Sequence, residues 1–211
     1  MKHLLIIGAR GFGREVYITA TESIGYGTDF EIKGYLDDNA SALDGYDGYP
    51  PIISSVEDYE PQDNDIFICA LGDVEWKKHY VEKVLAKGGK FVTLTHRHAY
   101  ISKNVKIGVG CIVCNQAIIS CDVTIGDFTT IQPHVIIGHD CQIGSMCQIN
   151  SNTSIGGFVI VGDKATLHTS TTLLPKSKIG NNATVGAGSV VLRKVSAGST
   201  VFGNPACSIN L

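Results

Sequence analysis

The sequence has 211 residues, 20 of them acidic and 17 basic, for a formal net charge of -3. This balance gives no basic field for nucleic acid, and no apolar stretch is long enough for a secretion signal or a membrane span. We therefore expect a cytoplasmic protein that binds neither nucleic acid nor membrane. The seven cysteines form no zinc-type ligand set, which indicates small buried thiols in a reducing compartment.

Residues 1–94 alternate short apolar runs with helical segments. The runs HLLIIG, EIKGYLDD, DIFICALG and KFVTLT predict strands, and REVYITATESIG and VEWKKHYVEKVLAKGG predict helices. In the second helix Trp76, Tyr80, Val84 and Leu85 recur at helical spacing. Strands that alternate with helices indicate βαβ units, so we expect a Rossmann-like α/β domain with a small parallel sheet over residues 1–94.

The second part of the chain follows a six-residue repeat. Every sixth residue from Ile101 to Val191 is Ile, Val or Leu. A strict period of six does not fit a helix, but it fits a triangular parallel β-helix whose inward aliphatic residues stack about 4.8 Å apart from coil to coil. Three repeats for each coil give about five coils over residues 101–191. Glycine often follows the aliphatic residue, which we interpret as backbone freedom at the corner.

Ordered motifs extend over nearly the whole chain: GARGFGREV, YLDDN, ALGD, TLTHRHAYIS, IIGHDCQIG, VGAGSVVLRKV and VFGNPA. Together they resemble the NeuD/PglD-type sugar O-/N-acyltransferases, which are hexapeptide-repeat enzymes. The resemblance implies an all-β left-handed parallel β-helix over residues 95–211, ending in a short tail, and a homotrimer with acetyl-CoA between adjacent β-helices. It also implies N-acetylation of a nucleotide-linked amino sugar for surface-glycan biosynthesis.

Acetyl transfer from a thioester needs a base and a donor that stabilises the developing oxyanion. His139 is followed by Asp140, and a carboxylate beside an imidazole can fix its tautomer. In the resembled family this pair is catalytic, which implies His139 as general base and Asp140 as the residue that orients it. The resemblance also implies that Gly157 supplies the oxyanion donor through its N–H. The alternatives are a solvated His–Asp pair and an ordinary corner glycine.

Further residues are assigned to acetyl-CoA. The segment VGAGSVV offers backbone groups to the pantetheine arm, and GNPA resembles the segment that flanks the adenine, although it could equally be the turn that ends the fold. The coenzyme residues expected besides Gly157 are Gly186, Ala187, Gly188, Gly203, Asn204 and Pro205.

The first domain resembles a sugar-nucleotide-binding domain. Its glycines follow a strand and open a helix, where a diphosphate can bind, and its acidic residues close the second and third strands at the same sheet edge. The substrate-binding residues expected are Gly8, Gly11, Phe12, Gly13, Asp37, Asp38, Gly72 and Asp73. An NAD site is the alternative, but the spacing GxxGxG departs from GxGxxG and about four strands are too few for a full dinucleotide fold.

Three positions depart from the family pattern. Phe12 and Gln148 stand where relatives often carry His, and Gln132 stands where they often carry Asn. These departures leave the identity of the acceptor open.

Three other functions compete with N-acetylation. The first is O-acetylation of sialic acid or another hydroxyl acceptor, because the same base serves both reactions. The second is a β-helix carbonic anhydrase-like metal enzyme that would use His98, His134 and His139. The third is a non-catalytic trimeric binding scaffold. The expected acetyltransferase itself requires no metal.

Overall fold

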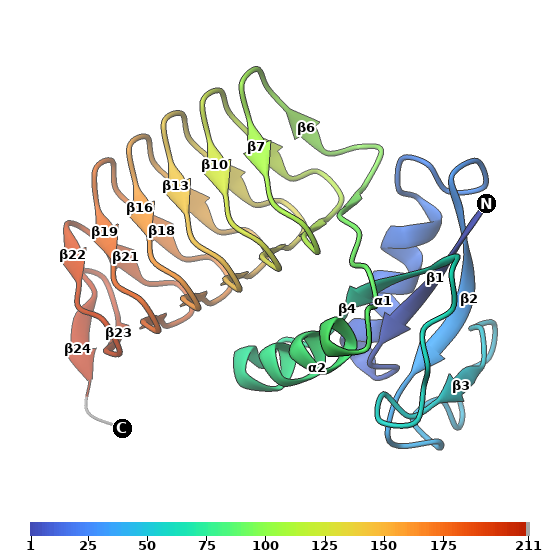
Figure 1. The fold of residues 1–211 in the computed structure, drawn as a ribbon. Helices are drawn as coiled ribbons and strands as arrows, with labels where there is room; N and C mark the ends of the chain where they lie inside the picture. The colour runs from blue at the N-terminus through green and yellow to red at the C-terminus, as the bar shows by residue number, and fades with distance from the viewer. Residues whose placement is uncertain (210–211) are drawn as a thin grey trace. The chain divides into compact units, whose positions relative to one another are not determined.

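The computed structural model describes residues 1–209, which form two compact units that divide after Arg97 (Figure 1). The division expected after residue 94 falls inside the short strand β5 (Leu94–Thr95). Within residues 1–209 no helix combines the length and the apolar character that crossing a bilayer requires.

The N-terminal unit contains a four-stranded parallel sheet with the order β3-β2-β1-β4. Its elements are β1 (Lys2–Ile7), α1 (Gly11–Thr21), β2 (Phe30–Leu36), β3 (Ile52–Ser54), β4 (Asp65–Cys69) and α2 (Val74–Ala86). The central strand β1 is one continuous apolar run because both of its faces are covered: Leu4, Leu5 and Ile6 are fully buried. The expected α/β class is confirmed.

One detail of this unit differs from the sequence-based expectation. The fourth strand of the sheet is β3, whereas KFVTLT contributes only β5 and an isolated bridge between Phe91 and Phe67. Strand β3 was missed because its three residues follow two prolines and give too short an apolar run to register. Of the residues placed at helical spacing in α2, Val84 is buried, together with Lys77 and Val81, whereas Trp76 is 57% exposed.

The second unit is the left-handed β-helix (Figure 1), built from two-residue strands that recur every six residues. These strands are β6 (Tyr100–Ile101), β7 (Lys106–Ile107), β8 (Ile112–Val113), β9 (Ile118–Ile119), β10 (Thr124–Ile125), β11 (Thr130–Ile131), β12 (Ile136–Ile137), β13 (Gln142–Ile143), β14 (Gln148–Ile149), β15 (Ser154–Ile155), β16 (Ile160–Val161), β17 (Thr166–Leu167), β18 (Thr172–Leu173), β19 (Lys178–Ile179), β20 (Thr184–Val185), β21 (Val190–Val191), β22 (Lys194–Val195) and the three-residue β23 (Thr200–Phe202).

The strands form three parallel sheets, named here after their members in the coil of His139. The β12 sheet has the order β21-β18-β15-β12-β9-β6, the β13 sheet has the order β22-β19-β16-β13-β10-β7, and the β14 sheet runs from β23 through β20, β17, β14 and β11 to β8. Strands β6 to β23, taken three at a time, give six coils among the described residues, against about five expected. The difference arises because β22 and β23 continue the winding beyond Val191.

The aliphatic repeat points inward, as expected. Ile119, Ile137 and Ile155 are in register on successive coils and are almost completely buried. A second inward position lies two residues earlier, at the corner, and small side chains fill it. Cys141 is one of these, and its Sγ donates to the Gly156 carbonyl at 3.0 Å. Five of the seven cysteines are buried, Cys121 is half-buried and Cys207 is exposed.

The interpretation of the repeated glycines needs correction. From Ile101 to Val185, positive φ occurs three residues after the repeated aliphatic residue, and thirteen of those corner positions are not glycine. Glycines such as Gly126 and Gly144, which directly follow the aliphatic residue, have no positive φ. A Cβ at Gly144 would lie 2.6 Å from the Asp163 backbone nitrogen on the next coil. Glycine is therefore required there by the close approach of two coils, and not by backbone freedom.

The last coils depart from the six-residue period. The connection from β21 to β22 is two residues shorter than the others, so Lys194 pairs with Lys178, which lies 16 residues earlier. The strand β24 (Cys207–Ile209) then turns back antiparallel to β23.

Candidate active site

His139 and Asp140 lie at the corner between β12 and β13. His139 Nδ1 is 2.7 Å from Asp140 Oδ2, and the imidazole is 53% exposed. A carboxylate that accepts a hydrogen bond from Nδ1 fixes the tautomer, which leaves Nε2 as the nitrogen that can take a proton from an acceptor. The structure thus brings the two expected catalytic residues into contact at a solvent-accessible corner.

The next coil completes this corner around the imidazole. Gly157 lies one coil above His139, and a Cβ at residue 157 would come within 2.8 Å of both Cε1 and Nε2. The Phe158 ring stands edge-on to the imidazole at 5.1 Å, and the Phe158 N–H donates to the His139 carbonyl. The ring is therefore held between Asp140 and Phe158.

The Gly157 N–H is free for a ligand. Ser145 and Asp163 hold the same position in the six-residue repeat as Gly157, after β13 and β16. The Ser145 N–H donates to Asp163 Oδ1, and the Asp163 N–H donates to Asn181 Oδ1. In both cases the acceptor belongs to a side chain one coil above. In the column of Gly157 the residue one coil above is Pro175, which carries no acceptor. Within residues 1–209 no protein acceptor for the Gly157 N–H is found.

A second carboxylate lies one coil below Asp140. Asp122 accepts a hydrogen bond from Asn104 Nδ2 at 2.9 Å. Hydrogen bonds from Asn104 and Cys121 lower the pKa of Asp122 from its usual 3.8, and the nearby His139 contributes in the same direction. The corner therefore carries negative charge on two successive coils.

A cavity of about 600 Å³ adjoins this corner on the β13 sheet. Asp140 is one of its lining residues, and Gln142 and Ile160 lie on the strands β13 and β16. The full lining is Asp122, Thr124, Asp140, Gln142, Ile143, Gly144, Ile160, Val161, Gly162, Asp163 and Asn181. The lining thus extends along the β-helix axis from Asp122 and Thr124, one coil below Asp140, to Asn181 on a later coil.

The remaining coenzyme residues expected from the sequence gather at a different corner. Gly186, Ala187 and Gly188 lie between β20 and β21. The tail folds back onto this corner, where the Gly203 N–H donates to Ser189 Oγ and the Gly203 carbonyl accepts from the Val190 N–H. Asn204 and Pro205 follow at once, joined by a cis peptide bond. Within one chain, these residues and His139 occupy different corners.

Two of the residues that depart from the family pattern, Gln148 in β14 and Gln132 directly after β11, belong to or adjoin the β14 sheet. Gln148 Nε2 donates to Asn150 Oδ1, and Gln132 Oε1 accepts from Ser151 Oγ, both at 3.0 Å. Each amide is thus engaged by a neighbouring polar side chain.

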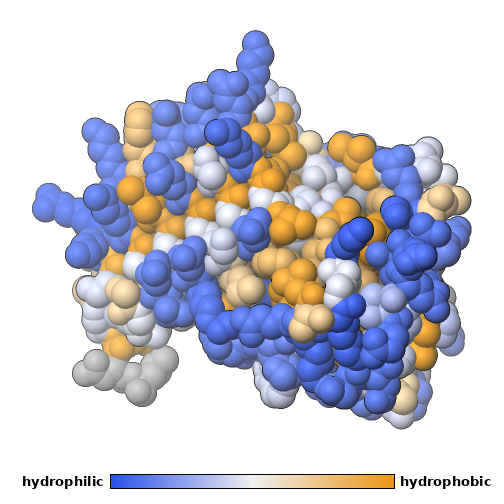
Figure 2. All heavy atoms as spheres, in the orientation of Figure 1, coloured by the Kyte–Doolittle hydropathy of each residue, from blue (hydrophilic) through white to orange (hydrophobic). Residues whose placement is uncertain are grey.

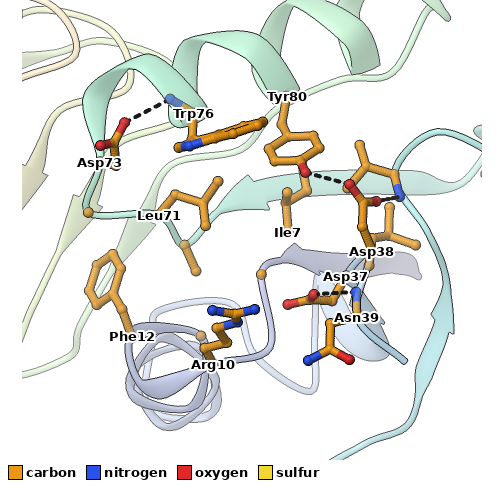
Figure 3. A pocket seen from close by; sticks show the side chains of 16 residues that line it. Ile7, Arg10, Phe12, Asp37, Asp38, Asn39, Leu71, Asp73, Trp76 and Tyr80 are labelled. Atoms are coloured by element: carbon orange, nitrogen blue, oxygen red, sulfur yellow. Dashed lines mark hydrogen bonds between the residues drawn. The ribbon is translucent and has the colours of Figure 1, made fainter. Parts of the chain in front are cut away.

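The N-terminal unit carries its own cavity, of about 540 Å³, at the carboxyl ends of β1, β2 and β4 (Figure 3). Seven of the eight expected substrate residues line it: Gly8, Phe12, Gly13, Asp37, Asp38, Gly72 and Asp73. Gly11 does not. Sequence reasoning missed other residues of the lining: Ile7, Arg10, Leu36, Asn39, Val56, Ala70, Leu71, Trp76 and Tyr80.

The glycine loop presents the start of α1 to this cavity. Gly8 has φ of +94°, and a Cβ at Gly13 would lie 2.0 Å from the Gly8 carbonyl oxygen, so the helix approaches the strand closely. Arg10 is the N-cap and makes no side-chain capping bond. The first-turn N–H groups therefore remain available to an anion, with the Arg10 side chain beside them (Figure 3).

The two carboxylates after β2 are already held by the protein. Asp37 accepts from the N–H groups of Ala9 and Asn39 at 2.8 and 2.9 Å. Asp38 accepts from the Val56 N–H and from the Tyr80 hydroxyl. They are fixed in position, and each oxygen keeps a second lone pair for a ligand.

Asp73 has a structural role that the sequence analysis did not assign. It caps α2 by accepting from the N–H groups of Glu75 and Trp76. The signal was present, because an acidic residue immediately before a helical run is a common N-cap.

An aromatic platform forms one wall of the cavity. The Trp76 ring stacks on Tyr80 with ring centres 5.9 Å apart and an interplanar angle of 26°. In Figure 3 the indole lies over the cavity, with Leu71 and Phe12 on the other side. Burial and the neighbouring Asp38 raise the pKa of Tyr80 to about 12, so its hydroxyl remains a donor. Such a platform suits a nucleobase.

The metal alternative finds no ligand set within a single chain. His134 and His139 lie on successive corners at the two ends of β12, and His98 precedes β6. Over residues 1–209, no three His, Cys, Asp or Glu side chains gather in a way that could hold a metal ion.

Comparisons with known proteins agree with both units. The family model described as the PglD N-terminal domain matches residues 3–84, and the model described as bacterial transferase hexapeptide (six repeats) matches residues 116–151. UDP-N-acetylbacillosamine N-acetyltransferase of Bacillus subtilis (strain 168) is 30% identical over 117 residues, which are 54% of this chain and 51% of that protein. The match thus spans about half the length of this curated relative.

Solved structures that match over nearly the whole chain include two acetyltransferases. The acetyltransferase domain of PglB from Neisseria gonorrhoeae FA1090, in complex with acetyl coenzyme A, has a TM-score of 0.86 and 26% identity and covers 99% of each chain. A point mutant of perosamine N-acetyltransferase from Caulobacter crescentus, in complex with CoA and GDP-perosamine, has a TM-score of 0.88 and 25% identity, over 100% of this chain and 98% of that chain. The resemblance to the PglD-type acyltransferases is confirmed.

Proposed function

Because both units of the chain match the PglD-type hexapeptide acyltransferases, we propose that this protein transfers the acetyl group of acetyl-CoA to the amine of a nucleotide-linked amino sugar. The observation that carries the proposal is the His139–Asp140 pair beneath the open Gly157 N–H. The relatives support the choice of substrates, since their names specify N-acetylation of amino sugars or complexes with CoA and a sugar nucleotide.

The proposed reaction uses each group of the corner once. The sugar amine attacks the thioester carbonyl carbon while His139 Nε2 takes its proton, and Asp140 orients the resulting imidazolium. The carbonyl oxygen, as it gains negative charge, accepts from the Gly157 N–H. The intermediate then collapses, the C–S bond breaks, and the imidazolium proton passes to the leaving thiolate. The products are the N-acetyl sugar nucleotide and CoA.

The N-terminal cavity would hold the nucleotide in this proposal. The open first turn of α1 and Arg10 suit the diphosphate, and the Trp76–Tyr80 platform suits the base. We propose further that the enzyme works as a homotrimer, because the expected coenzyme residues at the β20–β21 corner do not meet His139 within one chain. A cytoplasmic role in surface-glycan biosynthesis completes the proposal.

The proposal is tested by measuring thiol release from acetyl-CoA with UDP-, GDP- and dTDP-linked amino sugars. Turnover is expected with an amino sugar and not with its hydroxyl counterpart. His139→Asn should lose at least about a hundredfold in kcat and keep its affinity for CoA. His134→Asn, at the previous corner of the same coil, is the matched control and should keep its activity.

The competing functions give different results in the same experiment. Turnover of hydroxyl acceptors alone would establish O-acetylation. CoA binding without turnover of any acceptor would favour a scaffold. Full activity of His139→Asn would remove the imidazole from the mechanism.

A further inference from the structure

Cys121 lies one coil below His139 in the same column of corners. Ile119 and Ile137 are in register on β9 and β12, and Cys121 and His139 follow them at the same interval. The Asp140 N–H donates to the Cys121 carbonyl at 3.2 Å, which joins the two corners. The column begins between β6 and β7, on the upper ridge of the β-helix in Figure 1, and Figure 2 shows hydrophilic side chains projecting there. Its members are Lys103, Cys121, His139, Gly157 and Pro175.

The surroundings of Cys121 differ from those of the core cysteines. Cys121 is half-buried, and its thiol donates to the carboxylate of Asp122, on whose charge the nearby His139 also acts. The core cysteines of the corners are completely buried, and their thiols donate to main-chain carbonyls: Cys111, Cys141 and Cys147. Cys121 is therefore an accessible thiol in contact with titratable groups, whereas the core cysteines fill space.

The Cys121 corner repeats the pairing seen at the His139 corner. Each of the two residues is followed by an aspartate, and in both cases the first side chain contacts the carboxylate of the second. The two pairs, Cys121–Asp122 and His139–Asp140, thus place a thiol, an imidazole and two carboxylates on successive coils.

An open N–H is also present above the thiol. One coil above His139 lies Gly157, which has no side chain that could accept from the His139 N–H. Throughout residues 1–209, no protein group accepts from this N–H. A carbonyl oxygen that gains negative charge beside Cys121 would find a donor there, as the Gly157 N–H would serve an oxygen beside His139.

A thiol in this position is a chemical counterpart of the amine acceptor. The thiolate is the nucleophilic form of cysteine, so the thiol must lose its proton when it attacks. An imidazole is the side chain best suited to exchange that proton near neutral pH. Adjacent coils are about 4.8 Å apart, so the thiol of Cys121 and the ring of His139 are neighbours.

We propose that Cys121 is an acylation site, which accepts the acetyl group of acetyl-CoA when no amino sugar is bound. The Cys121 sulfur attacks the thioester carbonyl carbon while His139 Nε2 takes the thiol proton, and the oxyanion accepts from the His139 N–H. The C–S bond to CoA then breaks, and the imidazolium returns the proton to the departing CoA sulfur.

This exchange replaces one thioester by another. It therefore needs no oxidant or further reactant, and CoA can reverse it. The proposal rests on the proposed function and goes beyond it, because it adds a second acceptor that belongs to the protein itself.

The proposal is tested by incubating the full-length protein with acetyl-CoA and no acceptor. After removal of the coenzyme, mass spectrometry should find one acetyl group for each chain, located on Cys121. Neutral hydroxylamine should release this group, because it is held as a thioester. Cys121→Ser and Cys121→Ala should carry no hydroxylamine-sensitive group. Cys207→Ser removes the exposed cysteine instead, is the matched control and should be acetylated as the wild type is.

The rate of acetylation separates a catalysed exchange from the ordinary reactivity of an exposed thiol. His139→Asn should acetylate Cys121 at least about a hundredfold more slowly, whereas His134→Asn should match the wild type. CoA added to the acetylated wild type should remove the group and regenerate acetyl-CoA. Labelled CoA should likewise exchange into acetyl-CoA with the wild type and not with Cys121→Ser.

Acetylation confined to Cys207, or an equal rate in His139→Asn, would overturn the proposal, because ordinary thiol reactivity would then explain the modification. An unmodified Cys121 in a protein that acetylates an amino sugar would also overturn it, and the proposed function would stand. If the wild type neither acetylated an amino sugar nor bound acetyl-CoA, the proposed function would fail together with this proposal, and that result is distinct from the others.

Discussion

The imidazole of His139 occupies the space that a side chain at residue 157 would need: a Cβ on Gly157 would come within 2.8 Å of Nε2. Glycine at this position therefore serves the neighbouring coil, because the absence of a side chain lets the imidazole approach the backbone beside an open N–H. The relationship ties together two residues that are 18 positions apart in the sequence.

The substitution Gly157→Ala is expected to displace the imidazole and to lower kcat by about a hundredfold or more, while CoA binding persists. Thr169→Ala, at the same position of the six-residue repeat but at a different corner of the β-helix, serves as control. Steady-state kinetics and CoA titration of both variants check this. An active Gly157→Ala variant would show that the ring tolerates the methyl group and would weaken the proposed role of the corner.

Asp140→Asn should lower kcat about ten- to a hundredfold, because the amide cannot stabilise an imidazolium as a carboxylate does. The relevant contact is the 2.7 Å pair between Nδ1 and Oδ2. Asp122→Asn removes a carboxylate one coil below that bonds to Asn104 instead. Comparable losses in the two variants would indicate a general effect of charge and not orientation by Asp140.

Trp76 is the sole tryptophan of the chain, so its fluorescence reports on the N-terminal cavity alone. UDP, GDP or dTDP should change the emission, and pyrophosphate, which has no base, should not. Trp76→Leu should weaken nucleotide binding about tenfold, as for the loss of one stacked base. Trp76→Phe keeps an aromatic face and should retain most of the affinity. If none of the nucleotides changes the emission, Trp76 does not stack on the base.

The two kinds of corner glycine should respond differently to alanine. Gly144→Ala forces a Cβ to within 2.6 Å of a backbone nitrogen, so we expect a loss of about 2 kcal/mol or more in the free energy of unfolding. Gly188 has φ of +67° and open space around it, so Gly188→Ala should cost about 1 kcal/mol. Denaturant unfolding compares the two. A larger loss for Gly188→Ala would contradict the close-approach explanation.

The buried Asp65 predicts a pH dependence of stability. Burial would raise its pKa, but hydrogen bonds from Tyr59 and Lys33 outweigh burial and lower the pKa below 3.8. A carboxylate whose folded pKa is depressed contributes stability above its unfolded pKa of about 3.9 and loses it as pH falls through the folded value.

Asp65→Asn should therefore cost about 1–3 kcal/mol at pH 7, and the difference from wild type should narrow only below about pH 4. Asp63→Asn, at an exposed neighbouring position, should show no such difference. Unfolding curves at several pH values decide between these outcomes. If the difference in unfolding free energy between wild type and Asp65→Asn disappears already between pH 7 and pH 5, a group other than Asp65 is responsible.

The sequence predicted the β-helix well because this fold requires an inward-pointing aliphatic residue at every sixth position. Such a strict pattern can be read directly from the sequence. It predicted the His139–Asp140 contact through adjacency and family resemblance. It did not predict that Trp76 lines the N-terminal cavity, since helical spacing reveals that residues share a face and not what that face contacts. The family resemblance implied the Gly157 N–H as a donor, but the residues around it did not explain why it is open, which depends on Pro175 in the coil above.

The antiparallel turn of β24 across β23 has a consequence for assembly. A parallel solenoid ends in unpaired backbone groups that invite another chain to continue the stack, as happens in fibres. In this chain β24 pairs with β23, with Ser208 opposite Val201, so the last parallel strand of the β14 sheet already has a partner from the same chain. Copies of this protein should therefore associate side by side through the flanks of their coils rather than grow end to end.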